Sequence, residues 1–145
     1  MTRYGIGASI LFLAACGGGP PAAEPGGADG RQAIEVPVEA RDAIRLEMRT
    51  MLGSLHTLLA AAPRGDTAAM REAASRSGVA PSADMALERL LPEEFLKLGM
   101  NTHRQFDELA AAIPAGLPAD SLQARLGRIT ANCVACHDAY RLTTR

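Results

Sequence analysis

The stretch 120–142 reads DSLQARLGRITANCVACHDAYRL and repeats apolar residues at the spacing of a helix. Residues that recur every three or four positions fall on one face of an α-helix. That face comprises Leu122, Leu126, Ile129, Cys133, Cys136 and Tyr140. Asp120 or Ser121 is suited to cap the start of the helix. The stretch therefore predicts one long amphipathic helix with two cysteines on its buried face.

Cys133, Cys136 and His137 form a C-x-x-C-H motif, the attachment signature of a c-type haem. Two thiols three residues apart on a helix reach the two vinyl groups of one porphyrin. The adjacent histidine then lies under the iron and supplies a nitrogen ligand. We therefore expect one covalent haem c, bound through Cys133 and Cys136, with His137 as the proximal iron ligand.

Three other chemistries fit this motif less well. A zinc site needs four ligands, and the remaining histidines, His56 and His103, lie on distant segments. A thioredoxin-like redox pair belongs to a βαβ context, but no stretch of the chain alternates with period two, so we predict no strand. A disulfide between helical cysteines three residues apart has poor geometry.

Three further helices are expected upstream. Pro37 suits the first position of a helix that ends before Pro63. Residues 66–77 form a shorter helix, with Asp66 as N-cap and Gly78 as the stop, and an irregular stretch follows at 79–91. A third helix runs from Pro92 to Pro114. Four amphipathic helices on short links predict an all-α fold, an antiparallel four-helix bundle with covalently bound haem c.

The first of these helices carries a buried stripe, on the helical projection. Its expected members are Ile44, Met48, Met51, Leu55, Leu58 and Leu59. Arg49, Ser54 and Thr57 are expected to face away from it.

The N-terminus has the pattern of an export signal. Arg3 precedes a short apolar run, and residues 13–16, LAAC, resemble the lipobox of bacterial lipoproteins. An ordinary signal peptide with an incidental cysteine is the alternative. The expected parts are a signal peptide (1–15), lipidated Cys16 with a flexible Gly/Pro linker (16–33), and the haem domain (34–145). The protein is thus expected on a bacterial membrane facing the periplasm, and Gly17 slightly favours the outer membrane.

The run CVACHDAYR at 133–141 closely resembles the C-x-x-C-H-x-x-[YF]-R run that ends the last helix of class II cytochromes c, the cytochrome c′ and c-556 group. The resemblance extends over 37–142, and LPEEFLKLGMNTHRQFDELAAA is similar to the third helix of small members. It implies haem wedged between four helices, propionates toward solvent, and a sixth iron ligand, where present, from the first helix.

That resemblance also connects the sixth ligand to the function. Electron-transferring members use a first-helix methionine, whereas an apolar residue leaves the iron of cytochrome c′ five-coordinate. Met48 falls at the ligand position; Met51 or an open site is the alternative. His56 is expected in solvent, and His103 at the edge of the stripe. The expected function is one-electron transfer by a His/Met haem; the alternative is a five-coordinate protein that binds nitric oxide or carbon monoxide.

Class II members often carry an arginine one turn before the distal residue, near a propionate. Ile44 occupies that position here, so a neighbour, Arg41 or Arg45, is the candidate, and Arg45 is our choice. Arg141 matches the family's arginine near the proximal histidine.

The composition excludes several other classes of function. A formal net charge of -1 gives no basic field for nucleic acid. A haem peroxidase or oxidase would need an acid–base group over an open iron, and neither His56 nor His103 is well placed, so we expect no enzyme activity. The expected partners are redox proteins, the membrane through the lipid on Cys16, and in some members of the group a second copy.

Overall fold

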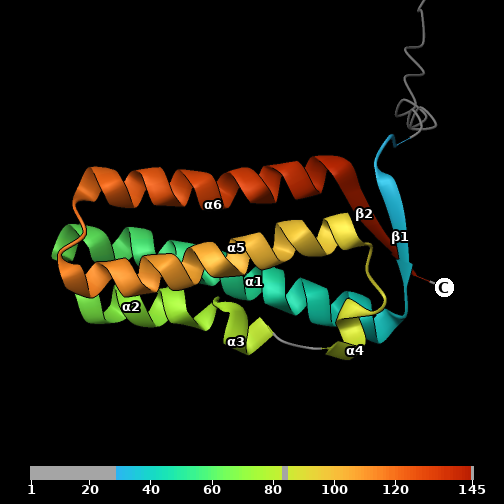
Figure 1. Ribbon diagram of the computed structural model, residues 1–145, viewed down its shortest axis with the longest axis horizontal. Coiled ribbons are helices and arrows are strands. Elements are labelled where there is room, and N and C mark those ends of the chain that lie inside the picture. The colour runs from blue at the N-terminus through green and yellow to red at the C-terminus, as the bar shows by residue number, and fades with distance from the viewer. Residues whose placement is uncertain (1–28, 83–84, 145) are drawn as a thin grey trace, which may run out of the picture.

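The structure is a computed structural model and describes residues 29–82 and 85–144. The expected signal peptide, Cys16 and most of the expected linker lie outside the described residues. The described part is mostly helical, as expected for an all-α protein. Four long helices follow its long axis in Figure 1: α1 (Val38–Ala61), α2 (Thr67–Arg76), α5 (Glu93–Ala112) and α6 (Ala119–Ala139).

Proline and aspartate define the helix starts. Pro37, Pro92 and Pro118 each stand at an N-cap, with backbone angles in the extended region. Asp66 caps α2 as predicted, because its carboxylate accepts a hydrogen bond from the backbone N of Ala69 at 3.0 Å. Pro37, expected at the first helical position, thus lies one residue before it, and of the four long helices only α2 has a side-chain cap.

Two tight turns connect the helices in pairs. The 3₁₀ turn η1 (Ala62–Arg64) follows α1, and η2 (Ile113–Ala115) follows α5. Each ends at a glycine in the left-handed region, Gly65 with φ 65° and Gly116 with φ 80°. A side chain would be strained at either φ, so glycine permits both reversals.

The ends of α6 differ from the prediction. The helix starts after Pro118, earlier than Asp120 or Ser121, and the carboxylate of Asp120 accepts instead from the backbone N of Ser121 at 2.7 Å. The helix ends at Ala139, so Tyr140 is not part of it. The stretch 79–91, expected to be irregular, contains two short helices, α3 (Val79–Ser82) and α4 (Met85–Glu88).

α2 ends just before Gly78, as expected, but Gly78 does not act through a left-handed turn. The C-cap of α2 is Ser77, and the φ of Gly78 is not positive. A Cβ at Gly78 would lie 1.9 Å from Oδ1 of Asp107, and Oδ2 of Asp107 accepts from the backbone N of Val79 at 3.0 Å. Glycine is therefore needed here for close approach to α5 rather than for a left-handed turn.

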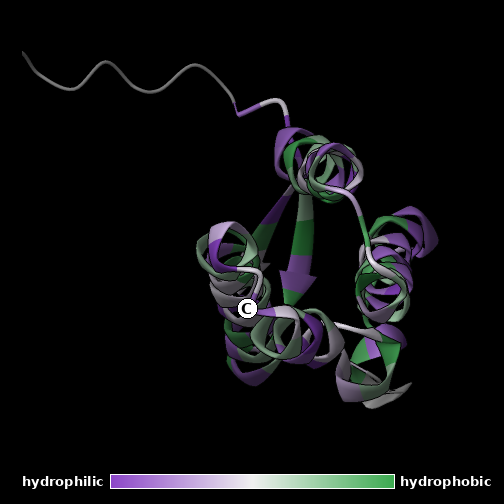
Figure 2. Ribbon diagram, turned by 90° about the vertical axis from the view of Figure 1, so that its left-hand side faces the viewer, coloured by the Kyte–Doolittle hydropathy of each residue, from purple (hydrophilic) through white to green (hydrophobic). Residues whose placement is uncertain are grey.

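The helices are unequally packed. α2 packs against both α1 and α5, whereas α6 packs mainly along α5. Viewed along the helices, α6 is the uppermost ribbon and stands apart from the others, with two strands visible behind (Figure 2).

Those two strands contradict the prediction that the chain has none. β1 (Gln32–Val36) pairs in parallel with β2 (Tyr140–Thr144), with Gln32 opposite Tyr140. They form a two-stranded ribbon at the end of the molecule where α6 finishes (Figure 1). β1 begins inside the range assigned to the linker. Its partner lies more than a hundred residues away, so local periodicity could not reveal the pairing.

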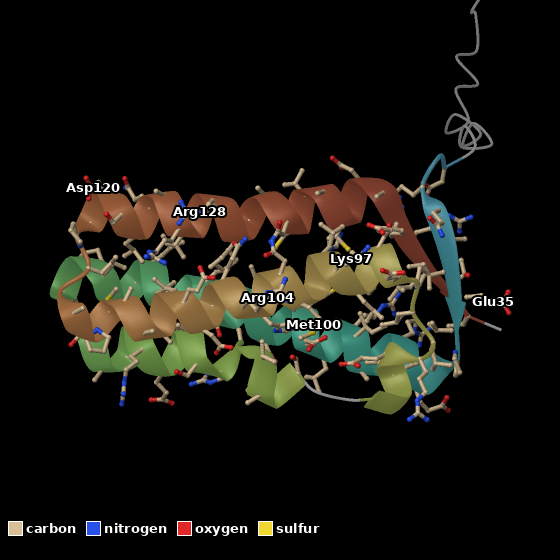
Figure 3. All side chains as sticks on the ribbon, viewed as in Figure 1. Glu35, Lys97, Met100, Arg104, Asp120 and Arg128 are labelled. Carbon is tan, nitrogen blue, oxygen red and sulfur yellow. The ribbon has the colours of Figure 1, made fainter. Side chains whose placement is uncertain are left out.

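The side chains of β1 alternate over a few residues. Ile34 and Val36 are buried, whereas Gln32, Ala33 and Glu35 are exposed. Glu35 points away from the helices (Figure 3). Strand geometry sends successive side chains to opposite faces, so this short alternation fixes one face of β1 onto the protein.

Two apolar clusters form the interior. The larger joins α1, α2, α5 and α6 and contains Leu58, Ala61, Met70, Ala73, Ala74, Phe106, Leu109, Ile113, Leu122, Leu126 and Ile129. The smaller lies at the ribbon end and contains Ile34, Val36, Ile44 and Phe95, with Met48, Cys136, Tyr140 and Leu142 packed against it. The ring of Phe95 meets that of Tyr140 edge-on at 5.5 Å.

The predicted stripe on α1 needs two corrections. Ser54, expected to face away, is buried, and its Oγ accepts a hydrogen bond from Oγ of Ser77 at 2.8 Å. Leu59, expected inside, is 60% exposed. Because α2 packs on α1, the buried arc of α1 extends toward Ser54, and the side that bears Leu59 faces solvent.

Candidate functional site

The last two turns of α6 carry the C-x-x-C-H motif. Cys133 and Cys136 are half-buried, and neither is in a disulfide. Burial raises the pKa of the Cys133 thiol, and burial followed by the proximity of Cys133 raises the pKa of the Cys136 thiol. Both side chains are therefore protonated thiols at neutral pH, unlike the activated thiolates of redox enzymes.

Both cysteines open into a cavity of about 520 Å³ between α1, α5 and α6. This volume falls within the range typical of small-molecule and cofactor sites, about 300–1,000 Å³. Its apolar walls come from α1 (Ile44, Met48, Met51, Leu52, Leu55), from α5 (Phe95, Leu96, Leu98, Gly99, Met100) and from Leu87 and Leu91. α6 contributes Thr130, Asn132, Cys133, Val134, Cys136 and His137.

His137 has a free imidazole. Its side chain is exposed and makes no hydrogen bond within the described part of the chain, while its backbone O accepts from Nη1 of Arg31 at 3.4 Å. A neighbouring hollow of about 180 Å³ shares Met48, Cys136 and His137 with the large cavity. The imidazole is thus available as a metal ligand.

The methionines of α1 differ in their surroundings. Met48 lines both hollows and packs against the cluster that Cys136 also contacts. Met51 lines only the larger cavity and packs against the other cluster. Met100, labelled near the middle of α5 in Figure 3, also lines the cavity and was missed from the sequence. All three share the larger cavity with Cys136 and His137, but of the three only Met48 also lines the smaller hollow with them.

The two remaining histidines are separated. His56 is exposed, as expected. His103, expected at the edge, is buried: Nδ1 lies 2.8 Å from the backbone O of Ser77, and Nε2 lies 3.2 Å from Oε1 of Glu47. Burial opposes the charged form, but the bonds to Glu47 and Ser77 outweigh it and raise the pKa of His103. His103 lines the cavity with both ring nitrogens already engaged.

The arginines near the site differ in whether they line a hollow. Arg45 is exposed and lines the smaller hollow, together with Arg141 and with Arg31, which sequence reasoning assigned to the linker. Arg41, the other candidate, pairs with Asp42 at 2.8 Å and lines neither hollow. The sequence feature that could have pointed to Arg31 is the alternation of Ile34, Glu35 and Val36 after it. This alternation is shorter than the roughly four to eight residues that indicate a strand.

Asn132 offers a direct check of whether a cofactor fits here. Its Nδ2 is buried and has no hydrogen-bond partner, although its side chain lines the cavity. An unsatisfied buried donor is costly unless a ligand or water meets it. Two protonated thiols, a free imidazole, a thioether on the opposite helix and apolar walls are the donor set that a haem c requires.

No group of three or more His, Cys, Asp or Glu side chains gathers as a metal site within residues 29–82 and 85–144. None of the described helices is long and apolar enough to cross a bilayer. Comparison with family models, curated proteins and solved structures found no match to this chain.

Proposed function

We propose that this protein is a c-type cytochrome that transfers single electrons through a haem held by Cys133, Cys136, His137 and Met48. The proposal includes the class II architecture, a four-helix bundle closed around the haem. The observation that carries it is that the C-x-x-C-H motif lines an apolar cavity, and that Met48 lies on the opposite wall of this cavity. In the part of the chain that the structure describes, both cysteines are free of disulfides, and the Cys133 thiol donates to the backbone O of Ile129 at 3.5 Å.

The attachment chemistry needs only what the site supplies. Cys133 and Cys136 would hold the haem as thioethers, since each thiol would add its sulfur to one vinyl carbon and its hydrogen to the other. No oxidant is consumed. The raised pKa values of Cys133 and Cys136 keep that hydrogen in place before the reaction.

The remaining residues define the redox properties. Bound haem supplies an iron that changes between ferric and ferrous states by one electron. His137 would hold the iron through its imidazole, and Met48 would offer a soft thioether, a ligand that favours ferrous iron. Apolar walls from α1 and α5 exclude water, and Arg45 and Arg141 offer guanidinium groups to the propionates.

One observation favours a second candidate, a five-coordinate protein that binds nitric oxide or carbon monoxide. Beside Met48, the α1 wall is formed largely by Met51, Leu52 and Leu55, so an iron without a sixth ligand would face an apolar space suited to small neutral gases. Peroxidase chemistry is less well supported, because both nitrogens of His103 are already bonded.

We also propose that the protein acts outside the bacterial cytoplasm, held on a membrane by lipid on Cys16. Its support is the sequence of the N-terminal segment. Covalent haem c attachment is consistent with an exported protein.

The test is the visible spectrum of the full chain, produced together with a haem c maturation system. We expect haem that resists acid-acetone extraction, low-spin bands in both oxidation states and no carbon monoxide binding. The variant with both Cys133 and Cys136 replaced by Ala should lose the covalent haem. Extractable haem in the unmodified chain would refute the proposal, and a high-spin spectrum with carbon monoxide binding would favour the gas-binding function.

A further inference from the structure

Three arginines from distant parts of the chain meet at one end of the cofactor cavity. Arg31 precedes β1, Arg45 lies on α1, and Arg141 lies on β2. All three line the hollow of about 180 Å³ that also contains Met48 and His137. This end of the cavity therefore carries a concentration of positive charge next to the proposed iron ligands.

The arginines have too few counter-charges among the described residues. Asp29 accepts from Nε of Arg31 at 2.9 Å and from Nη2 at 2.7 Å. Nε of Arg141 lies 3.6 Å from Asp29, is buried and has no hydrogen bond. Arg45 has no ion pair among the described residues. Asp29 thus serves both Arg31 and Arg141, Asp138 acts on Arg31 from a distance, and Arg45 contacts no carboxylate among the described residues.

Asp29 shows how a carboxylate binds here. Hydrogen bonds from Arg31 hold the pKa of Asp29 at about 2, well below its usual range. The guanidinium fork matches any carboxylate in this two-pronged geometry. The propionates of a haem are carboxylates too, so a propionate could bind the guanidinium of Arg31 in the same two-pronged geometry.

The position of Arg31 is fixed by buried structure. Ile34 and Val36 of β1 are buried in the cluster against which Met48 and Cys136 pack. Nη1 of Arg31 also donates to the backbone O of His137 at 3.4 Å. The strand therefore holds Arg31 against the turn that carries the proximal ligand.

We propose that Arg31 is a haem-binding residue: a propionate takes the place of Asp29 on its guanidinium, so β1 is part of the cofactor site. This inference rests on the proposed haem function. It also adds a segment that precedes the family-like region 37–142.

The experiment compares haem-loaded full chains that carry Arg31→Gln, Arg31→Lys or Arg76→Gln. Arg76 pairs with Glu72 on the surface of α2 and serves as the matched control. The readouts are the ferrous-to-ferric ratio at a fixed redox poise and the propionate bending band in the resonance Raman spectrum. If Arg31 contacts a propionate, its substitution shifts the propionate bending band. If Arg31 has only a structural role, the band does not shift.

We expect Arg31→Gln to lower the ferrous-to-ferric ratio by on the order of three- to tenfold, because the propionate charge near the iron is no longer offset. Arg31→Lys keeps the charge and should change the ratio less than about twofold, while the loss of the planar fork still shifts the Raman band. Arg31→Lys decides the question alone if Arg31→Gln does not fold.

A Raman band unchanged in both Arg31 variants would overturn the inference, even if the redox ratio moved, because Arg31 would then act only as a distant charge. That result would leave the haem function intact. Failure of the unmodified chain to hold covalent haem is a separate outcome, and it would refute the proposed function itself.

Discussion

Met48 is the residue on which the choice between electron transfer and gas binding depends. Its thioether lies on the walls of both hollows that contain His137, so it is the side chain best positioned to approach the iron from the opposite helix. A methionine in an apolar cluster can equally be a filler of irregular space. Replacing Met48 by an apolar residue of similar volume separates the role of iron ligand from that of core filler.

Met48→Leu should convert a low-spin haem to a high-spin one that binds carbon monoxide, and should lower the reduction potential. Leucine has a similar volume, so the packing cost should stay below about 1.5 kcal/mol. The visible spectrum and a carbon monoxide titration measure the change. Met51→Leu and Met100→Leu are the matched controls from the same cavity. A spectral change in Met51→Leu alone would assign the ligand one turn further along α1.

His103 is a second residue with a measurable signature. It links three elements, since its ring bonds Glu47 of α1 and the C-cap Ser77 of α2 from its place on α5. Its raised pKa means that the folded protein binds the proton more tightly than the unfolded chain does. The corresponding stabilisation is fully present below the unfolded value, near 6.5, and is lost as pH rises through the folded pKa.

We expect the free energy of unfolding of the unmodified protein to fall over that pH window relative to His103→Gln. Denaturant titrations of both proteins between about pH 5 and 8 measure the difference. Glu47→Gln removes the main favourable partner of His103 and should flatten the dependence. Parallel stability profiles for the unmodified protein and His103→Gln would show that the imidazole does not titrate with folding.

At the scale of elements, the β ribbon is the feature that the helical reading missed. Ile34 is buried at 4% exposure, and it packs in the cluster that reaches the cofactor cavity. Ile34→Ala should therefore reduce the free energy of unfolding by about 2–5 kcal/mol. Leu59→Ala on the exposed face of α1 is the control, with an expected change within about 0.5 kcal/mol. Equal effects in urea unfolding would mean that β1 contributes nothing to the folded state.

The successes and errors of the sequence prediction divide by the range of the interactions. The starts of α2 and α5 could be predicted because Asp66 and Pro92 act on their own helices. The pairing of β1 with β2 depends on a remote segment. Ser54 and Leu59 were exchanged because helical periodicity gives the direction of a side chain but not which neighbour lies there.

The candidate site divides in the same way. The C-x-x-C-H spacing is a local feature of the sequence, so it identified Cys133, Cys136 and His137 as candidates. Met48 of α1 lines the same cavity as these three residues. Arg31 could not be predicted, since the pairing of β1 with β2 is what brings it to the smaller hollow. Met100 carries no signal that distinguishes it from other apolar residues of its helix.

At the scale of the whole molecule, the ribbon connects the N-terminal segment to the end that bears the proposed haem site. β1 begins at Gln32 beside the turn that carries His137, so the chain leaves the domain at the edge where the arginines gather. Cys16 and Asp29 are thirteen positions apart in the sequence. Even fully extended, this stretch spans no more than about 45 Å. A lipid on Cys16 would therefore keep this edge within about 45 Å of the bilayer.

Cys16→Ser tests the anchor on the intact chain. Without a thiol there is no acylation site, so the protein should move from the membrane fraction to soluble or unprocessed forms. Because each buried methylene of an acyl chain contributes about 0.8 kcal/mol to membrane binding, the shift should be nearly complete. Fractionation followed by haem staining measures it, and Gly18→Ala, which leaves the cysteine, is the control.

The haem spectrum of Cys16→Ser should not change, since Met48 and His137 lie far along the chain from the substitution. A processed Cys16→Ser protein that stays in the membrane fraction would contradict the lipid anchor, while leaving the haem site untouched.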